Sequence, residues 1–368
     1  METLSVLFLS WRDLRNPDAG GAEVFTHEVG RRWASLGHDV TLVTSAFSDS
    51  PREETVDGVR VIRRGNPFTV YHHAKNIFLG RFAGKVDVAI DEVNTRPFLA
   101  SGYVDGSTQL FALIYQLARE FWSYETPFPM NWLGRYWLED RWLRRYRSVP
   151  TFTISESTRD DLIRLDFRDV TVVPPGVSLV PLERLPEKDD VPTLVYVARL
   201  KRAKFPDHAL RVFALVKRRL PSAQLWVIGD GYMRASLERS APDGTTFFGR
   251  IPDEAKAALL RRAHILLAPA VREGWSLAVL EANACGTPAI GYRVPGLQDS
   301  IRHEETGFLV PFGNVDELGN TAVALLKDPS RRIELAANAL RWAGEFNWDR
   351  TATRLLDCLQ GRVGPGVT

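Results

Sequence analysis

The sequence predicts an α/β protein made of two domains in succession. Short apolar runs, typical of buried parallel strands, alternate with helical segments in both halves of the chain. A length of 368 residues suits two domains, and 45% hydrophobic with 25% charged residues is typical of a soluble globular protein. Between the halves, residues 174–191 become charged and proline-rich, which indicates a linker.

The first half opens with a predicted strand at residues 5–10, a glycine turn at Gly20 and Gly21, and a helix from Val24 to Leu36. Glycine lets backbone approach an anion closely, so the turn is a candidate phosphate contact. Without a G-x-G-x-x-G motif, an ordinary tight turn explains it slightly better. Further strands are predicted at 39–44, 59–63, 86–90, 111–118, 150–155 and 170–173.

The strand at 86–90 leads into the polar stretch Asp91–Pro97. Ligands of parallel sheets gather at the carboxyl ends of strands, so these side chains are site candidates. An ordinary solvated loop explains them about as well.

The second half repeats the strand and helix alternation. Its strands are predicted at 193–198, 224–229, 246–249, 264–268 and 307–310, with a strand and turn at 291–296, and its helices at 207–220, 315–327, 331–345 and 347–359. A tight turn at Gly229 closes the strand at 224–229.

A strand, a loop and a helix start follow one another around Ser276. Backbone N–H groups over Trp275, Ser276 and Leu277 have no partner inside the predicted helix and lie at the positive end of its dipole. An anionic group, most simply a phosphate, would be stabilised there.

Two glutamates flank this helix start: Glu273 lies on the loop with Gly274, and Glu281 lies just over one turn into the helix. Both carboxylates could accept hydrogen bonds from hydroxyl groups, and the side chain of Glu281 leans back toward the helix start. This arrangement suits a ligand that joins phosphates to polyols, as a sugar nucleotide does. From spacing alone, two solvated surface glutamates are an equally good explanation.

Two cations, Arg199 and Lys204, follow the strand at 193–198. Such a pair can clamp a diphosphate, although exposed loop cations are common.

The segment REGWSLAVLEANACGTPAIG, with Glu273 and Glu281 separated by seven residues, resembles the signature of the retaining glycosyltransferases of family 4, also called group 1. Gly286-Thr287-Pro288 and residues 305–310 fit the same pattern. The resemblance implies the GT-B fold, in which two Rossmann-like domains face each other across a cleft. It implies an acceptor domain at 1–173, a nucleotide-sugar donor domain at 192–345, and a C-terminal helix with a tail at 346–368 that crosses back to the first domain.

The resemblance also assigns roles to residues. Glu273 is expected to bind the sugar hydroxyls, Arg199 and Lys204 to neutralise the leaving nucleotide, and Glu281 to bind the ribose. The other expected donor contacts are Gly20, Gly21, Gly229, Arg250, Ile251, Gly274, Trp275, Ser276 and Leu277. The departing phosphate is expected to accept the acceptor's proton. No cofactor or metal is expected, because no Asp-x-Asp pair follows a strand.

One residue departs from the family pattern. Tyr115 precedes Gln-Leu-Ala-Arg-Glu where the resemblance leads us to expect a histidine that contacts the transferred sugar. We count Tyr115 among the catalytic candidates, although a phenol is a poor base at neutral pH.

Composition excludes several other classes. A net charge of +2 is too mild to argue for nucleic-acid binding, which would need basic residues clustered along one face. Two cysteines are too few for a disulfide framework and favour a reducing compartment, the cytoplasm by default. The N-terminal apolar run is too short for a signal peptide, and no run is long enough to span a membrane.

Residues 132–147 concentrate tryptophan, tyrosine and arginine. Such a helix could rest on an anionic membrane surface. A core-facing helix with a solvated basic side explains it better, since Glu139 and Asp140 interrupt the basic face.

The sequence therefore predicts a metal-independent, retaining hexosyltransferase that uses a nucleoside-diphosphate sugar. The alternatives are a relative that performs an unusual N-, S- or pseudo-sugar coupling, and a nucleotide-sugar binding protein without turnover. The pattern does not choose between UDP, GDP and ADP donors, or between small-molecule, glycan and lipid-linked acceptors, and it gives no oligomeric state.

Overall fold

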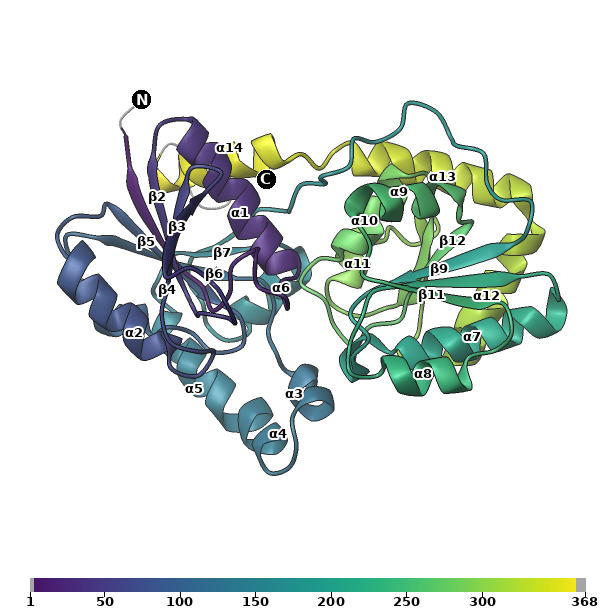
Figure 1. Cartoon of the computed structure of the whole chain (residues 1–368), viewed down its shortest axis with the longest axis horizontal. Helices are drawn as coiled ribbons and strands as arrows, with labels where there is room; N and C mark the ends of the chain where they lie inside the picture. Colours follow the sequence, from purple (N-terminus) through teal and green to yellow (C-terminus); the bar gives the residue numbers. More distant parts are fainter. Residues whose placement is uncertain (1–2, 362–368) are drawn as a thin grey trace. The chain divides into compact units, whose positions relative to one another are not determined.

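The computed structural model describes residues 3–361 and divides the chain into two compact units, each built around its own sheet (Figure 1). The first unit comprises the chain up to Arg119, Trp132–Gly176 and the chain from Trp348 onward. The second unit comprises Glu120–Asn131 and Val177–Asn347. Both units have the α/β architecture predicted from the sequence.

The first unit contains an eight-stranded sheet in the order β3-β4-β2-β1-β5-β6-β7-β8. All neighbours are parallel except β3 and β4, which form an antiparallel hairpin at the edge. The strands are β1 (Ser5–Leu9), β2 (Asp39–Thr44), β3 (Glu53–Val56), β4 (Val59–Arg63), β5 (Val88–Val93), β6 (Gln109–Ile114), β7 (Thr151–Thr153) and β8 (Val170–Val172). Strand β3 was not predicted, because the edge segment Glu53–Val56 is not buried and has no apolar run.

The C-terminal helix lies on the first unit, beside α1 (Figure 1). Trp33 of α1 donates its indole N–H to the carbonyl of Ala352 at 2.9 Å, and the ring of Trp348 packs edge-on against Phe25. The helical segments of this unit are α1 (Gly21–Ser35), α2 (Val70–Ile77), η1 (Phe78–Phe82), η2 (Ala100–Gly102), α4 (Met130–Leu133), η3 (Gly134–Leu138), α5 (Glu139–Leu143), η4 (Arg144–Tyr146), α6 (Glu156–Ile163) and α14 (Trp348–Leu359); α4 begins in the second unit.

The second unit is a six-stranded parallel sheet in the order β11-β10-β9-β12-β13-β14. The strands are β9 (Thr193–Val197), β10 (Gln224–Ile228), β11 (Thr245–Gly249), β12 (Ile265–Ala268), β13 (Ala289–Tyr292) and β14 (Gly307–Val310).

Helices cover both faces of this sheet, with α9, α10 and α13 on one side and α7, α8 and α12 on the other (Figure 1). Their apolar sides and the strands form one continuous core. The helical segments are α3 (Glu120–Glu125), η5 (Arg202–Lys204), α7 (Pro206–Arg219), α8 (Arg234–Ser240), α9 (Asp253–Arg262), α10 (Leu277–Ala284), α11 (Leu297–Ser300), α12 (Val315–Lys327) and α13 (Pro329–Ala343).

Three predicted strands have wrong boundaries. Strand β6 covers Gln109–Ile114 rather than 111–118, because its neighbours β5 and β7 pair with it only as far as Ile114, so Tyr115 lies just beyond the strand. Strand β5 does not end at residue 90 but continues to Val93, so Asp91 and Glu92 lie inside the sheet and are 0% and 1% exposed. They are therefore buried strand residues and not part of a solvated loop. Strand β13 covers Ala289–Tyr292 rather than 291–296. The chain turns at Gly286, which has a positive φ, and the strand therefore begins two residues earlier than predicted.

The chain leaves the first unit after Gly176, inside the predicted linker, and returns to it at Trp348. Residues 120–131, which the sequence placed in the first domain, group with the second unit. Their side chains pack there: the ring of Tyr124 meets Phe205 edge-on at 5.1 Å. The predicted tail lies outside the described residues.

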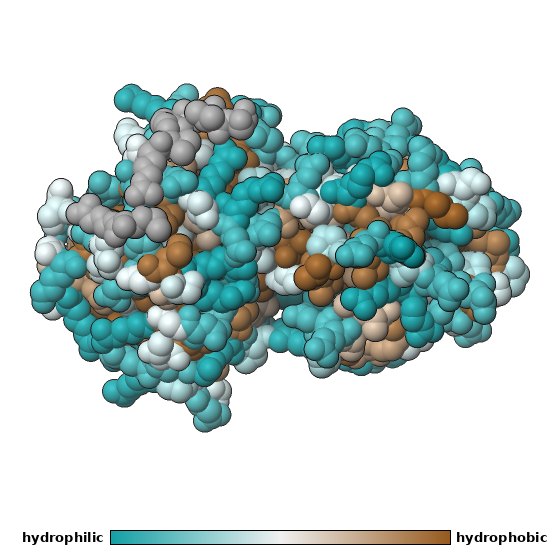
Figure 2. Space-filling view, turned by 90° about the horizontal axis from the view of Figure 1, so that it is seen from above, coloured by the Kyte–Doolittle hydropathy of each residue, from teal (hydrophilic) through white to brown (hydrophobic). Residues whose placement is uncertain are grey.

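On the face shown in Figure 2, hydrophilic residues predominate, and hydrophobic areas lie between them. Among residues 3–361, no helix combines the length and the hydropathy needed to cross a membrane.

Candidate active site

The predicted donor residues of the second unit gather at one edge of its sheet. Arg199 follows β9, Gly229 follows β10, and Arg250 and Ile251 follow β11. Because β11, β10, β9 and β12 are adjacent and parallel, the residues that follow them share the carboxyl edge, where α/β proteins bind ligands. A Cβ at Gly229 would lie 2.1 Å from the carbonyl oxygen of Ala198, so this close approach of two strand ends requires glycine.

Lys204 and Glu273 form an ion pair at this edge, with 14% and 18% of their side chains exposed. Lys204 ends η5, after β9, and Glu273 lies on the loop after β12, so the structure brings together two catalytic candidates that are 69 residues apart. Limited exposure strengthens their attraction, yet both groups stay within reach of a ligand.

The loop that carries Glu273 is fixed by its neighbours. The backbone N–H of Glu273 donates to the carbonyl of Pro295 at 3.0 Å. Gly296 has a φ of +79°, and a Cβ there would lie 2.1 Å from the Glu273 carbonyl oxygen. Glycine at 296 therefore holds the two loops together and sets the position of Glu273.

Helix α10 begins as predicted, with Ser276 as its N-cap. The Ser276 side chain makes no capping hydrogen bond, and the first turn contains no acidic residue. The helix end therefore keeps its positive character and suits an anion. Next to it, Gly274 is buried and the ring of Trp275 packs against Phe346 at 5.1 Å.

Glu281 lies one turn into α10 and pairs with Lys256 of α9 at 2.8 Å. Burial raises the pKa of Glu281, while the Lys256 ammonium opposes that rise. Sequence reasoning missed Lys256. Its spacing within α9 looks like an ordinary exposed helix face, so only the contact reveals its link to the site.

A second feature that sequence reasoning missed is the segment that begins with α3. Glu120 pairs with the largely buried Arg272 at 2.8 Å, and the ammonium of Lys204 lies 5.8 Å from the ring centre of Phe121. Glu125 accepts hydrogen bonds from the backbone N–H of Ala203 at 2.8 Å and from the Tyr232 hydroxyl at 2.9 Å. The sequence offered one signal for this segment's link to the site, namely that Arg272 directly precedes the candidate residue Glu273.

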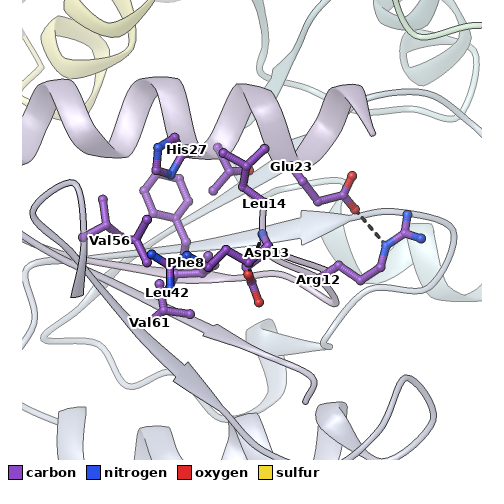
Figure 3. Close-up of a pocket in the computed structure, with 12 residues that line it drawn as sticks. Phe8, Arg12, Asp13, Leu14, Glu23, His27, Leu42, Val56 and Val61 are labelled. Carbon is purple, nitrogen blue, oxygen red and sulfur yellow. Dashed lines mark hydrogen bonds and ion pairs between the residues drawn. The ribbon is translucent and has the colours of Figure 1, made fainter. Parts of the chain in front are cut away.

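Within the first unit, Gly20 is the N-cap of α1 and Gly21 is its exposed first residue, so the helix starts three residues earlier than predicted. The carboxylate of Glu23 accepts the Gly20 N–H at 2.7 Å and pairs with Arg12 at 3.0 Å (Figure 3). A cavity of about 20 Å³ beside this pair has room for about one water molecule. The glycine turn is therefore the start of α1, and the Glu23 carboxylate fixes it by accepting the Gly20 N–H and pairing with Arg12.

Tyr115 directly follows β6 and is only 6% exposed. Its hydroxyl donates to the carbonyl of Ala22 at 3.2 Å and lies 3.0 Å from the hydroxyl oxygen of Thr26. Burial raises the pKa of Tyr115 well above its usual range, so the phenol keeps its proton. This hydroxyl is engaged with the first turn of α1.

Comparison with known proteins covers almost the whole chain. Residues 19–180 match the family described as "Glycosyltransferase Family 4", and residues 182–342 match "Glycosyl transferases group 1".

Among curated relatives, the D-inositol 3-phosphate glycosyltransferase of Salinispora tropica is 33% identical over 403 residues, spanning 92% of this chain and 80% of the relative. The enzyme of the same name from Thermobispora bispora is 32% identical over 388 residues, spanning 92% and 89%.

Solved structures share the fold at low identity. Sucrose-phosphate synthase from Thermosynechococcus elongatus gives a TM-score of 0.79 at 19% identity, covering 98% of this chain and 99% of that one. WaaG, a glycosyltransferase of lipopolysaccharide biosynthesis, gives 0.76 at 17% identity, covering 97% and 100%. Together with the two α/β units, whose sheets are parallel apart from the β3–β4 hairpin, these matches identify the fold as GT-B. The chain therefore belongs to the group 1 glycosyltransferases of family 4, and it is a glycosyltransferase.

Proposed function

We propose that the protein transfers a hexose-type sugar, with retention at the anomeric carbon and without a metal, from a nucleoside-diphosphate sugar. The observation that carries this proposal is the Lys204–Glu273 pair at the carboxyl edge of the second sheet, beside the uncapped start of α10. A donor carries both the diphosphate that would attract Lys204 and the hydroxyls that Glu273 would bind. One ligand can therefore satisfy both members of the pair.

In the proposed reaction, Lys204 and Arg199 stabilise the negative charge that develops on the leaving diphosphate. The start of α10 binds phosphate oxygens, Glu281 the ribose, and the backbone at Arg250 and Ile251 the base. The departing phosphate accepts the acceptor's proton as the new glycosidic bond forms on the same face. No side chain is then needed as a base, which is compatible with tyrosine at position 115.

The names of relatives suggest substrates to test first. Curated relatives are D-inositol 3-phosphate glycosyltransferases, so a phosphorylated polyol is the first acceptor to try. Anabaena HepE, with a TM-score of 0.71 at 14% identity, was solved with UDP and glucose, which makes UDP the first nucleotide to try. Glycan and lipid-linked acceptors form the second group. The relatives favour neither unusual coupling nor binding without turnover.

A peripheral membrane contact is the second part of the proposal, and the burial of Glu139 supports it. Glu139 is 2% exposed and accepts the backbone N–H groups of Ala118 and Arg119, while Asp140 pairs with the Arg119 side chain. Glu139 is thus buried and does not interrupt the outer basic face, contrary to the sequence-based argument, whereas Asp140 is partly exposed and paired with Arg119.

The outer side of this segment combines exposed aromatic and basic residues. They are Trp132, Tyr136, Trp137, Arg141, Arg144 and Arg145. The guanidinium of Arg141 lies 5.0 Å from the ring centre of Trp137. This composition suits the headgroup layer of an anionic membrane.

The transfer proposal is tested by incubating the protein with UDP-, GDP- and ADP-sugars and the acceptors above, with and without EDTA. An α-linked product from an α-linked donor, formed equally with EDTA, is the expected result. An inverted anomer or strict metal dependence would contradict the mechanism.

The membrane contact is tested by flotation with vesicles containing phosphatidylglycerol at low salt. Binding is expected for the wild type and should weaken when Trp137 and Arg141 are both changed to serine. Equal flotation with neutral vesicles would contradict an electrostatic contact.

A further inference from the structure

Glu92 is a buried acid in the middle of the first unit's sheet, and the proposed reaction does not use it. It lies on β5, flanked by β1 and β6, and is 1% exposed. Its Oε1 atom lies 2.6 Å from the hydroxyl oxygen of Thr26, whereas Oε2 has no hydrogen-bond partner among the described residues. An ionised carboxylate would leave half of its charge there without a donor.

Hydrogen-bond geometry around Thr26 favours the neutral acid. The Thr26 hydroxyl oxygen is close to three oxygens: Oε1 of Glu92, the Tyr115 hydroxyl at 3.0 Å and the carbonyl of Ala22 at 3.1 Å. A hydroxyl has one proton to donate and can accept two.

If Glu92 is neutral, its proton on Oε1 is donated to Thr26, Thr26 donates to Ala22, and Tyr115 donates either to Thr26 or to the Ala22 carbonyl at 3.2 Å. Three protons then serve the four oxygen contacts, whereas an ionised Glu92 leaves only two. If Glu92 is ionised, Thr26 must give its only proton to the carboxylate, and its contact with Ala22 joins two acceptors.

The neighbouring charge of Glu23 also favours the neutral form of Glu92. From α1, Glu23 faces the site and is paired with Arg12, while Thr26 and Tyr115 contribute only hydroxyls. Asp91, on the opposite face of β5, is engaged with the Phe98 and Ala100 backbone. Burial raises the pKa of Glu92 to about 8, and the charge of Glu23 adds to the rise, although the hydroxyls of Thr26, Ser10 and Tyr115 lower the pKa.

We propose that Glu92 is a positioning residue that acts as a neutral carboxylic acid, holding Thr26 and Tyr115 against the first turn of α1. That turn carries Gly20 and Gly21, the candidate donor contacts of this unit. Loss of the proton reverses the Glu92–Thr26 hydrogen bond and takes the Thr26 proton away from Ala22. The effect on transfer depends on the proposed function, whereas the protonation state of Glu92 does not.

The experiment compares thermal unfolding midpoints of the wild type and Glu92→Gln from pH 5 to 9. A folded-state pKa of about 8, above the ordinary value of 4.5, means that stability is complete below about pH 4.5 and is lost as pH rises to about 8. Glutamine is neutral throughout and can donate to Thr26. The midpoint of Glu92→Gln should therefore rise relative to wild type up to pH 8 and then stay constant. Glu156→Gln, at an exposed position of α6, is the control and should show a constant difference over pH 6 to 9.

Transfer measured on the same proteins tests positioning. The wild-type rate should fall about tenfold between pH 7 and 9, following the neutral fraction of a group with a pKa of about 8, while Glu92→Gln keeps its rate. Glu92→Ala should be slow at both pH values, and glutamine should restore the rate.

A pH-independent difference in midpoint between wild type and Glu92→Gln would overturn the neutral acid. A normal rate in Glu92→Ala would overturn the positioning role. If neither protein transfers sugar, the unfolding data still decide the protonation state, so failure of the proposed function is distinguishable from failure of this inference.

Discussion

Polar side chains have different environments in the two units. In the first unit, Arg63 and Asp13 form an ion pair with 0% and 2% of their side chains exposed. Glu92 and Tyr115 are also buried there and contact Thr26 of α1. In the second unit, the Lys204–Glu273 pair stays partly exposed. The first unit uses polar groups to fix loops and a helix start, whereas the second keeps paired charges that a ligand can reach.

The largest effect is expected where the buried pair of the first unit is broken. Asp13→Asn removes the charge that faces Arg63 at 2.7 and 2.9 Å, and leaves a buried guanidinium only partly compensated. We expect a loss of about 3 kcal/mol in the free energy of unfolding, measured by urea denaturation.

The control for this change lies in the second unit. Asp189 also binds a guanidinium through two oxygens, that of Arg262, but with 23% and 56% of the side chains exposed. Asp189→Asn should cost less than about 1 kcal/mol. Equal losses in the two variants would contradict the contrast between the units.

The second-largest effect is expected at the partly exposed Lys204–Glu273 pair of the second unit, and it is an effect on transfer. Lys204→Ala removes a cation expected to stabilise the leaving diphosphate, and transfer should fall about 100-fold, which is about 2.7 kcal/mol of transition-state stabilisation. Lys327→Ala, on the exposed end of α12, is the control and should leave the rate unchanged. A wild-type rate in Lys204→Ala would remove this residue from the catalytic candidates.

The third prediction concerns pH, where the second unit should respond oppositely to Glu92. Burial, assisted by Arg332, lowers the pKa of His264 to about 4, and its Nδ1 accepts the Thr193 N–H at 3.1 Å. Because the folded-state pKa lies below the ordinary value of 6.5, this contribution is complete above about pH 6.5 and is lost as pH falls to about 4.

His264→Asn keeps an acceptor without titrating. Its unfolding midpoint should rise relative to wild type between pH 6.5 and 4, as measured by calorimetry. A parallel decline of both proteins would mean that His264 is protonated in the folded state.

The smallest effect is expected at α3. Glu120→Gln removes a carboxylate whose side chain is 34% exposed, so its pair with Arg272 should contribute about 1 kcal/mol or less. A modest weakening of donor binding, measured by calorimetry, should accompany the loss if Arg272 steadies the neighbouring Glu273. Unchanged donor affinity would confine Glu120 to a structural role.

The parts of the fold that local patterns specify were predictable. The apolar runs of β2 and β4 and the helix start at Ser276 depend on neighbouring residues, and the structure places them as predicted. The GT-B fold and the family also followed from the resemblance.

Contacts between distant residues were not predictable in the same way. The polar pair Asp91 and Glu92 looks like the end of a strand, and only the sheet on both sides of β5 shows that it is buried. Lys256 is 25 residues from Glu281, and no local pattern joins them. A single sequence contains no direct record of such pairs.

The position of α3 has a consequence for dissecting the enzyme. The chain enters or leaves the second unit at four points, so no single cut separates the units. A polypeptide of residues 177–347 would lack Glu125, which accepts the Ala203 N–H, and the Tyr124 ring that covers Phe205. We expect such a fragment to aggregate, whereas the same fragment with residues 120–131 joined to it by a short glycine linker should stay monomeric.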